Sequence, residues 1–126
     1  MNFLTDRPIY LQIMDFIIQQ IVSGVLHPGM KIKPVRELAV ELATNPNTVQ
    51  RALQELEREE ILFSKRGLGR FVTEDSEKIN QLKEHAVAAV IEHFLTEMKK
   101  FGFTQEQVKE LLSKHIEKER TNEGIN

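Results

Sequence analysis

The chain has 126 residues, of which 40% are hydrophobic and 29% charged, and its net charge is −2. These values are typical of a globular domain, exclude a disordered or collagen-like chain, and give no support for a non-specific polyanion binder. The absence of cysteine excludes a disulfide framework, a thiolate zinc site and a cysteine nucleophile, and it fits a reducing cytoplasm. The longest nearly apolar stretch, 13–22, is too short and too polar to cross a bilayer, so we expect a cytoplasmic protein without a membrane partner.

Three helices are expected in the first half of the chain. Apolar residues at helical spacing predict a first helix over 8–23. After a short extended segment, a second helix begins near Pro34. A third helix must begin at Pro46, because Asn45 is a good N-cap and proline is favoured in the first helical turn. The second and third helices are therefore joined by a tight turn.

The third predicted helix has two contrasting faces. Its apolar core stripe is formed by Val49, Ala52, Leu53 and Leu56. The opposite face is expected to carry no acidic residue and consists of Asn47, Gln50, Arg51, Gln54 and Arg58. An α-helix fits the DNA major groove, where Asn and Gln pair with adenine and Arg with guanine, so Asn47, Gln50 and Arg51 are predicted base readers. The Thr48 hydroxyl and the N–H groups at the starts of the second and third helices are predicted phosphate contacts. On periodicity alone, a solvated surface helix that binds nothing is the alternative.

Two short strand-like runs, 61–63 and 71–73, flank a basic tip with two glycines and predict a β-hairpin. Lys65, Arg66 and Arg70 place positive charge where the backbone can approach a groove or a phosphate closely, although the tip alone would also fit an ordinary glycine-rich turn. The order helix, helix-turn-helix and hairpin predicts a winged helix-turn-helix domain over residues 1–74.

The last third of the chain predicts a helical hairpin. A long helix over 75–101 ends at Gly102, and Thr104 with Gln107 forms a capping box that opens a last helix before a frayed tail at 121–126. A helix about 40 Å long, at about 1.5 Å per residue, cannot bury its apolar stripe against one short helix and a small winged domain. We therefore predict that the tail over 75–126 dimerises, with packing onto the winged helix of the same chain as the alternative. The predicted interface consists of Val90, Phe94, Leu95, Met98, Phe101, Leu111, Leu112 and Ile116.

The titratable residues predict no catalytic or metal chemistry. His85 and His93 lie two turns apart, too far for one ion, and His115 with Glu119 is expected to be a solvated pair. The sequence contains no Ser/His/Asp order, no P-loop and no carboxylate pair within a cleft. We therefore expect no metal, no cofactor and no enzymatic activity. The sequence leaves open whether a small-molecule effector exists.

Five segments of the first two-thirds of the chain form a specific pattern: PIYLQI at 8–13, SGVLHPGMKI at 23–32, VRELA at 35–39, NPNTVQRALQELE at 45–57 and KRGLGRFV at 65–72. This pattern resembles the winged-helix domain of GntR-type bacterial transcription regulators. The resemblance implies that Arg36 reaches a base in the major groove. It also implies that the third helix faces DNA through Asn47, Thr48, Gln50 and Arg51. The hairpin tip is then expected to enter the minor groove through Gly67, Leu68 and Gly69.

Two positions depart from the family pattern. Lys33-Pro34 stands where the family usually has Pro-Ser or Pro-Thr, so Lys33 is expected to replace a phosphate-binding hydroxyl by charge alone. Glu60 stands where the family favours glycine, so we expect a strained left-handed backbone there. Because only residues 75–126 follow the wing, the chain resembles the short subgroup named after YtrA, whose tail is a helical hairpin used for dimerisation.

Together these features predict a homodimeric transcription regulator, a repressor, that binds an inverted-repeat operator in double-stranded DNA. Two recognition helices about one DNA turn apart match a palindrome, whereas one helix makes too few contacts for specific binding. The alternative from another class is a winged-helix protein-interaction module without DNA binding. An RNA-binding winged helix is disfavoured, because the chain lacks the exposed aromatic residues that stack on single-stranded bases.

Overall fold

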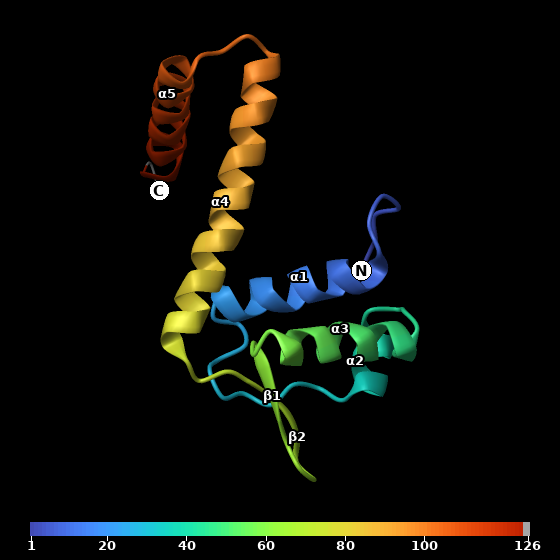
Figure 1. The fold of residues 1–126 in the computed structure, drawn as a ribbon. Coiled ribbons are helices and arrows are strands. Elements are labelled where there is room, and N and C mark those ends of the chain that lie inside the picture. The colour runs from blue at the N-terminus through green and yellow to red at the C-terminus, as the bar shows by residue number, and fades with distance from the viewer. Residues whose placement is uncertain (125–126) are drawn as a thin grey trace. The chain divides into compact units, whose positions relative to one another are not determined.

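The computed structural model describes residues 1–124 (Figure 1). Within them the elements follow the order α1 (Ile9–Val22), α2 (Val35–Glu41), α3 (Pro46–Arg58), β1 (Leu62–Lys65), β2 (Gly69–Val72), α4 (Ser76–Lys100) and α5 (Gln105–Gly124). The predicted class, mostly helical with one small hairpin, is confirmed. The chain forms two compact units, and the division falls inside α4, after His85. The functional boundary expected at residue 74 stays a prediction. No helix in the described part of the chain is long and apolar enough to span a membrane.

The core of the first unit lies between α1, α2, α3 and the hairpin. α1, α2 and β1 all contact α3. Ile79 and Leu82, in the first turns of α4, pack against the same core. Burying one large apolar side chain contributes roughly 1.5–3 kcal/mol, so the apolar stripe of α3 holds that helix firmly in one orientation. The most deeply buried side chains are Ile13, Val49, Leu53, Leu56, Ile61, Leu62 and Val72.

Left-handed residues other than glycine end two helices of this unit. The backbone has φ = 52° at Ala43, after α2, and φ = 62° at Glu60, after α3. At the end of α3 the Glu60 N–H donates to the Glu57 carbonyl and the Ile61 N–H donates to the Leu56 carbonyl, both at 2.9 Å. This is a Schellman motif, a helix end that favours glycine at the left-handed position. The conformation expected at Glu60 is confirmed, whereas the same motif at Ala43 was not predicted from the sequence.

The hairpin is short and has a tight tip. β1 and β2 pair antiparallel, with Lys65 opposite Gly69. The Leu68 N–H donates to the Lys65 carbonyl at 2.9 Å, and Gly67 has φ = 77°, a conformation open to glycine without strain. The extended segment 30–33 adds alongside β2 through an isolated bridge and backbone hydrogen bonds, so it anchors the base of the wing.

The second unit contains the later turns of α4 and the whole of α5. Gly102, with φ = 83°, ends α4. The predicted capping box is confirmed: the Gln107 N–H donates to Thr104 Oγ1 at 3.2 Å, and the Thr104 N–H donates to Gln107 Oε1 at 2.9 Å. α5 continues through Gly124, so the frayed tail predicted from residue 121 is wrong for 121–124, and residues 125–126 lie outside the described part.

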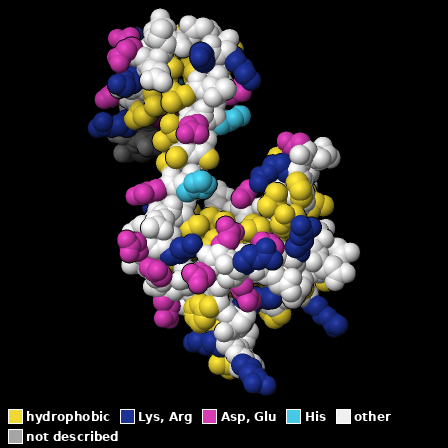
Figure 2. All heavy atoms as spheres, in the orientation of Figure 1, with side chains coloured by type: hydrophobic (Ala, Val, Ile, Leu, Met, Phe, Trp, Pro, Cys, Tyr) yellow, Lys and Arg dark blue, Asp and Glu magenta, His cyan; other side chains and the backbone are white. Residues whose placement is uncertain are grey.

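This unit has little core of its own. Among its described side chains only Val108 is buried, at 5% exposure. Hydrophobic side chains therefore reach the surface of the α4–α5 hairpin, where Figure 2 shows them in yellow. The large apolar residues exposed there are Val87, Val90, Ile91, Phe94, Phe101, Phe103, Leu111, Leu112 and Ile116.

Candidate nucleic-acid interface

α3 carries the predicted base readers on the side away from its core stripe. Asn47 and Arg51 are exposed, and Gln50 is half-buried. The helix begins as predicted: Pro46 occupies the first helical position, and the Asn45 Oδ1 atom accepts a hydrogen bond from the Asn47 N–H at 2.8 Å. The cap therefore determines where the helix starts and which side chains face outward.

The N–H groups at the start of α3 are not available to phosphates. Pro46 has no N–H, the Asn47 N–H is bound by the Asn45 side chain, and the Thr48 N–H donates to the Asn45 carbonyl at 3.0 Å. The free N–H groups predicted at the start of α3 are therefore not found, because the same cap that starts the helix uses its first donors, and phosphate binding there stays a prediction. The side chain of Thr48 is half-buried.

Arg51 stacks on an aromatic ring of α1. Its guanidinium carbon lies 3.8 Å from the centroid of the Tyr10 ring. Such a contact contributes about 0.5–1 kcal/mol at an exposed site, and it holds the side chain toward α1. The sequence did not indicate this contact between Arg51 and Tyr10, because the two residues are far apart in the chain and only the packing of α1 on α3 brings them together.

The hairpin tip presents positive charge, which Figure 2 shows as blue side chains at the bottom of the view, where the hairpin lies in Figure 1. Arg66, Gly67 and Leu68 are exposed. The Lys65 Nζ atom lies 4.8 Å from the Phe71 ring centroid and 5.6 Å from that of Phe63, so this cation lies along the hairpin.

Arg70 joins the wing to α3. Its Nε donates to Glu57 Oε1, and its Nη1 donates to Gln50 Oε1 at 3.3 Å. The Ser64 hydroxyl also donates to Glu57 Oε1, at 2.7 Å. Burial raises the pKa of the Glu57 carboxyl, but the hydrogen bonds from Arg70 and Ser64 and the charge of Arg70 outweigh it and lower that pKa.

This arrangement corrects one expectation. The outer face of α3 was predicted to be free of acid, yet Glu57 lies two helical turns after Gln50 and both contact Arg70. The carboxylate is paired with the arginine, so it adds no unpaired negative charge beside Gln50.

The segment before α2 and the start of α2 bring two further predicted cations to this unit. The Lys33 Nζ atom lies 2.7 Å from Glu41 Oε2, and this hydrogen bond and the charge of Glu41 raise the pKa of Lys33. Lys33 also lines one hollow together with Leu68, Gly69 and Arg70 of the wing, so the chain brings these predicted residues together.

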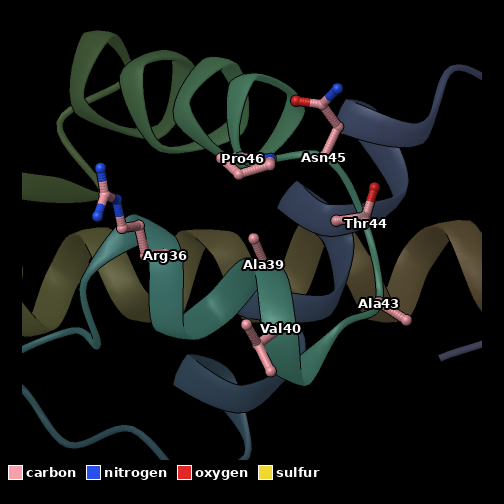
Figure 3. A pocket seen from close by; sticks show the side chains of 7 residues that line it. All are labelled: Arg36, Ala39, Val40, Ala43, Thr44, Asn45 and Pro46. Carbon is pink, nitrogen blue, oxygen red and sulfur yellow. The ribbon is translucent and has the colours of Figure 1, made fainter.

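Arg36 stands at the edge of a shallow hollow between α2 and the start of α3 (Figure 3). Its guanidinium and the Asn45 amide supply the long polar side chains around this hollow, while Val40, at 83% exposure, supplies apolar surface. The other lining residues are Ala39, Ala43, Thr44 and Pro46.

The first unit thus has the architecture of a winged helix-turn-helix protein: a capped helix with outward amide and guanidinium groups, a preceding helix joined by a tight turn, and a basic hairpin. Residues 9–72 match the family described as "Bacterial regulatory proteins, gntR family". The chain belongs to this family of regulators and is therefore not an enzyme.

Relatives extend the similarity beyond the winged domain. The HTH-type transcriptional regulator YhcF of Bacillus subtilis (strain 168) is 42% identical over 109 residues, which cover 86% of this chain and 90% of that protein. The HTH-type transcriptional repressor YtrA of the same organism is 36% identical over 94 residues, covering 70% of this chain and 72% of that protein. Membership of this chain in the short YtrA-like subgroup is thus consistent with these similarities.

Two solved structures are similar as well. A GntR family transcriptional regulator from Listeria monocytogenes has a TM-score of 0.81 and 41% identity, and the match covers 89% of this chain and 98% of that one. The structure of AraR(DBD) in complex with operator ORX1 has a TM-score of 0.52 and 28% identity, and the match covers 58% of this chain and 90% of that one.

Proposed function

We propose that the protein is a DNA-binding transcription repressor that inserts α3 into the major groove and places the hairpin tip against the adjacent backbone or minor groove. The observation that carries the proposal is the outward face of α3, where Asn47 and Gln50 present hydrogen-bonding groups and the nearby carboxylate is paired with Arg70. The family membership, the repressor YtrA and the operator complex of AraR(DBD) support it. This function places the protein in the cytoplasm.

Within this proposal the predicted contacts take different parts. Arg36 and Arg66 supply charge to the duplex, since among residues 1–124 the structure shows no ion pair to either. To contact a phosphate, Lys33 must give up its ion pair with Glu41. Arg51 contacts the duplex either from its stacked position on the Tyr10 ring or after leaving that ring. The remaining proposed contacts are Asn47, Thr48, Gln50, Lys65, Gly67, Leu68 and Gly69, and Arg70 takes part through its hydrogen bond to Gln50.

The proposed active form is a homodimer on an inverted repeat, with residues 1–74 binding DNA and the helical tail over 75–126 pairing two copies. The exposed apolar surface of the second unit supports this, because Val90 is 69% and Phe101 76% exposed while only Val108 is buried among its described side chains. A helical hairpin with so little core needs a partner to be stable. The further proposed interface residues are Phe94, Leu95, Met98, Leu111, Leu112 and Ile116.

Competition gel shifts test the DNA-binding function. Duplexes selected from a random pool should bind far more tightly than random duplex, and Arg36→Ala and Arg51→Ala should both weaken binding while the protein stays folded. Arg120→Ala, which removes an exposed arginine of α5, is the matched control and should bind as the wild type does. A folded protein that selects no duplex, but captures a protein partner equally well with and without Arg36, would instead support the interaction-module alternative.

Sedimentation tests the dimer separately. Val90→Asp should convert the dimer to a monomer, because it places a charge within an apolar interface. Val25→Asp alters another exposed valine, in the first unit, and should leave the dimer intact. A wild-type protein that sediments as a monomer at micromolar concentration would contradict the dimer.

A further inference from the structure

Arg70 differs from the other basic residues of the hairpin in being largely covered. Its side chain is 20% exposed and lies between two groups of α3, the carboxylate of Glu57 and the amide of Gln50. Ser64 of β1 donates to the same Glu57 oxygen, so three elements meet at one carboxylate. The contacts join residues that lie 7 to 20 positions apart.

The chemistry of this contact determines how the Gln50 amide is turned. A guanidinium has only donors, so the amide atom that faces Arg70 must be the oxygen. The NH₂ group of Gln50 then points away from Arg70, with both of its hydrogens available to another acceptor. The fork of Arg70 can hold Glu57 and Gln50 at once, because its Nε and Nη1 donors lie in one rigid plane.

A direct phosphate contact by Arg70 is disfavoured by its partner. If the arginine swung out to a phosphate, the Glu57 carboxylate would be left without its counter-charge beside a polyanion. Arg66, which lies exposed in the tip between β1 and β2, can reach a phosphate without breaking such a pair.

We propose that Arg70 is a positioning residue for sequence recognition: anchored by Glu57, it holds the Gln50 amide so that its NH₂ group faces the bases. The proposal rests on the proposed DNA-binding function. A donor group in this orientation matches bases with acceptors in the major groove, which are guanine, adenine and thymine, and rejects cytosine, which presents its N4 donor. Arg70 thereby acts on specificity at one base pair in each half-site, through Gln50.

Selection from a random duplex pool tests the proposal, with the full-length protein and its variants. The wild type should exclude cytosine at one position of each half-site. Arg70→Met should relax that position by about tenfold and leave the base preferences at the other positions unchanged, while the unpaired Glu57 carboxylate weakens binding to all sequences alike. Arg66→Met is the matched control, and it should weaken binding to all sequences and reduce the magnitude of the salt slope by about 2, because each copy of the dimer loses one phosphate contact.

Two further variants keep the test decisive if Arg70→Met is unstable. Arg70→Lys retains the charge beside Glu57 but lacks the planar fork, and it should relax the same position. In a Gln50→Ala background, Arg70→Met should have no further effect on discrimination. An unchanged consensus, with or without a uniform loss of affinity like that of Arg66→Met, would overturn the positioning role. A folded wild type that selects no sequence would overturn the DNA-binding function itself.

Discussion

Replacing Glu60 by glycine should stabilise the protein, and the structure sets the size of the effect. Glu60 has φ = 62° at the end of α3, a conformation that costs a non-glycine residue about 1–2 kcal/mol. Glycine removes that cost but increases the freedom of the unfolded chain, which opposes the gain by about 0.4–1 kcal/mol. The net expectation is a gain of about 0.5–1 kcal/mol, or about 2–4 °C in Tm if unfolding is two-state.

Two neighbouring changes separate backbone strain from charge. Glu60→Gln removes the negative charge next to Glu59 and Glu57 but keeps the Cβ atom, so it should recover little of the gain. Glu59→Gly places glycine where φ is −84°, an ordinary conformation, and should destabilise by about 0.5–1 kcal/mol. Thermal and urea unfolding of the three variants give the comparison. If Glu60→Gly were no more stable than Glu60→Gln, the strain argument would be refuted.

Three further predictions follow from the same structure. Ala43→Gly should also raise the free energy of unfolding, by less than about 1 kcal/mol, since Ala43 takes the left-handed position of the Schellman motif that ends α2, and urea unfolding measures this gain. Gln12→Leu should lower the free energy of unfolding by about 1–3 kcal/mol and expose the N-terminus to proteases, because the Gln12 side chain forms hydrogen bonds with the backbone of Leu4 and Arg7 at 2.8 to 2.9 Å. Resistance to limited proteolysis equal to that of the wild type would count against this prediction. The pKa of Glu57 is lowered in the folded state, so its contribution to stability is present above its ordinary value of 4.5 and is lost as the pH falls through the lower folded value. Unfolding of the wild type and of Glu57→Gln should therefore converge on acidification below pH 4.5, and a constant difference would contradict the ion pair.

The features that sequence analysis predicted correctly depend on residues close together in the chain. Asn45 caps α3, Thr104 and Gln107 form a capping box, and Glu60 is left-handed. Each of these is decided within about one helical turn, by the hydrogen bonds that a helix end leaves open. The alternation of core and surface residues along α3 is equally local, which is why its buried stripe was predicted in full.

The features that were missed depend on tertiary packing. The contact of Arg51 with Tyr10 needs α1 to lie on α3, and the pair of Arg70 with Glu57 needs the hairpin to fold back toward α3. Periodicity predicted an outer face of α3 without acidic residues, and it could not show that a wing arginine neutralises Glu57. Four predicted DNA-contacting cations therefore have partners in the folded chain that residue type alone did not indicate: Lys33, Arg51, Lys65 and Arg70.

The salt dependence of DNA affinity tests the central claim most directly. A dimer that neutralises roughly six to ten phosphates on its selected duplex should lose affinity with a slope of about −5 to −9 in log K against log salt. It should also retain a preference for the selected duplex over random sequence at each salt concentration. A folded protein whose affinity shows a slope near zero, or no preference for any duplex at low salt, would contradict the account.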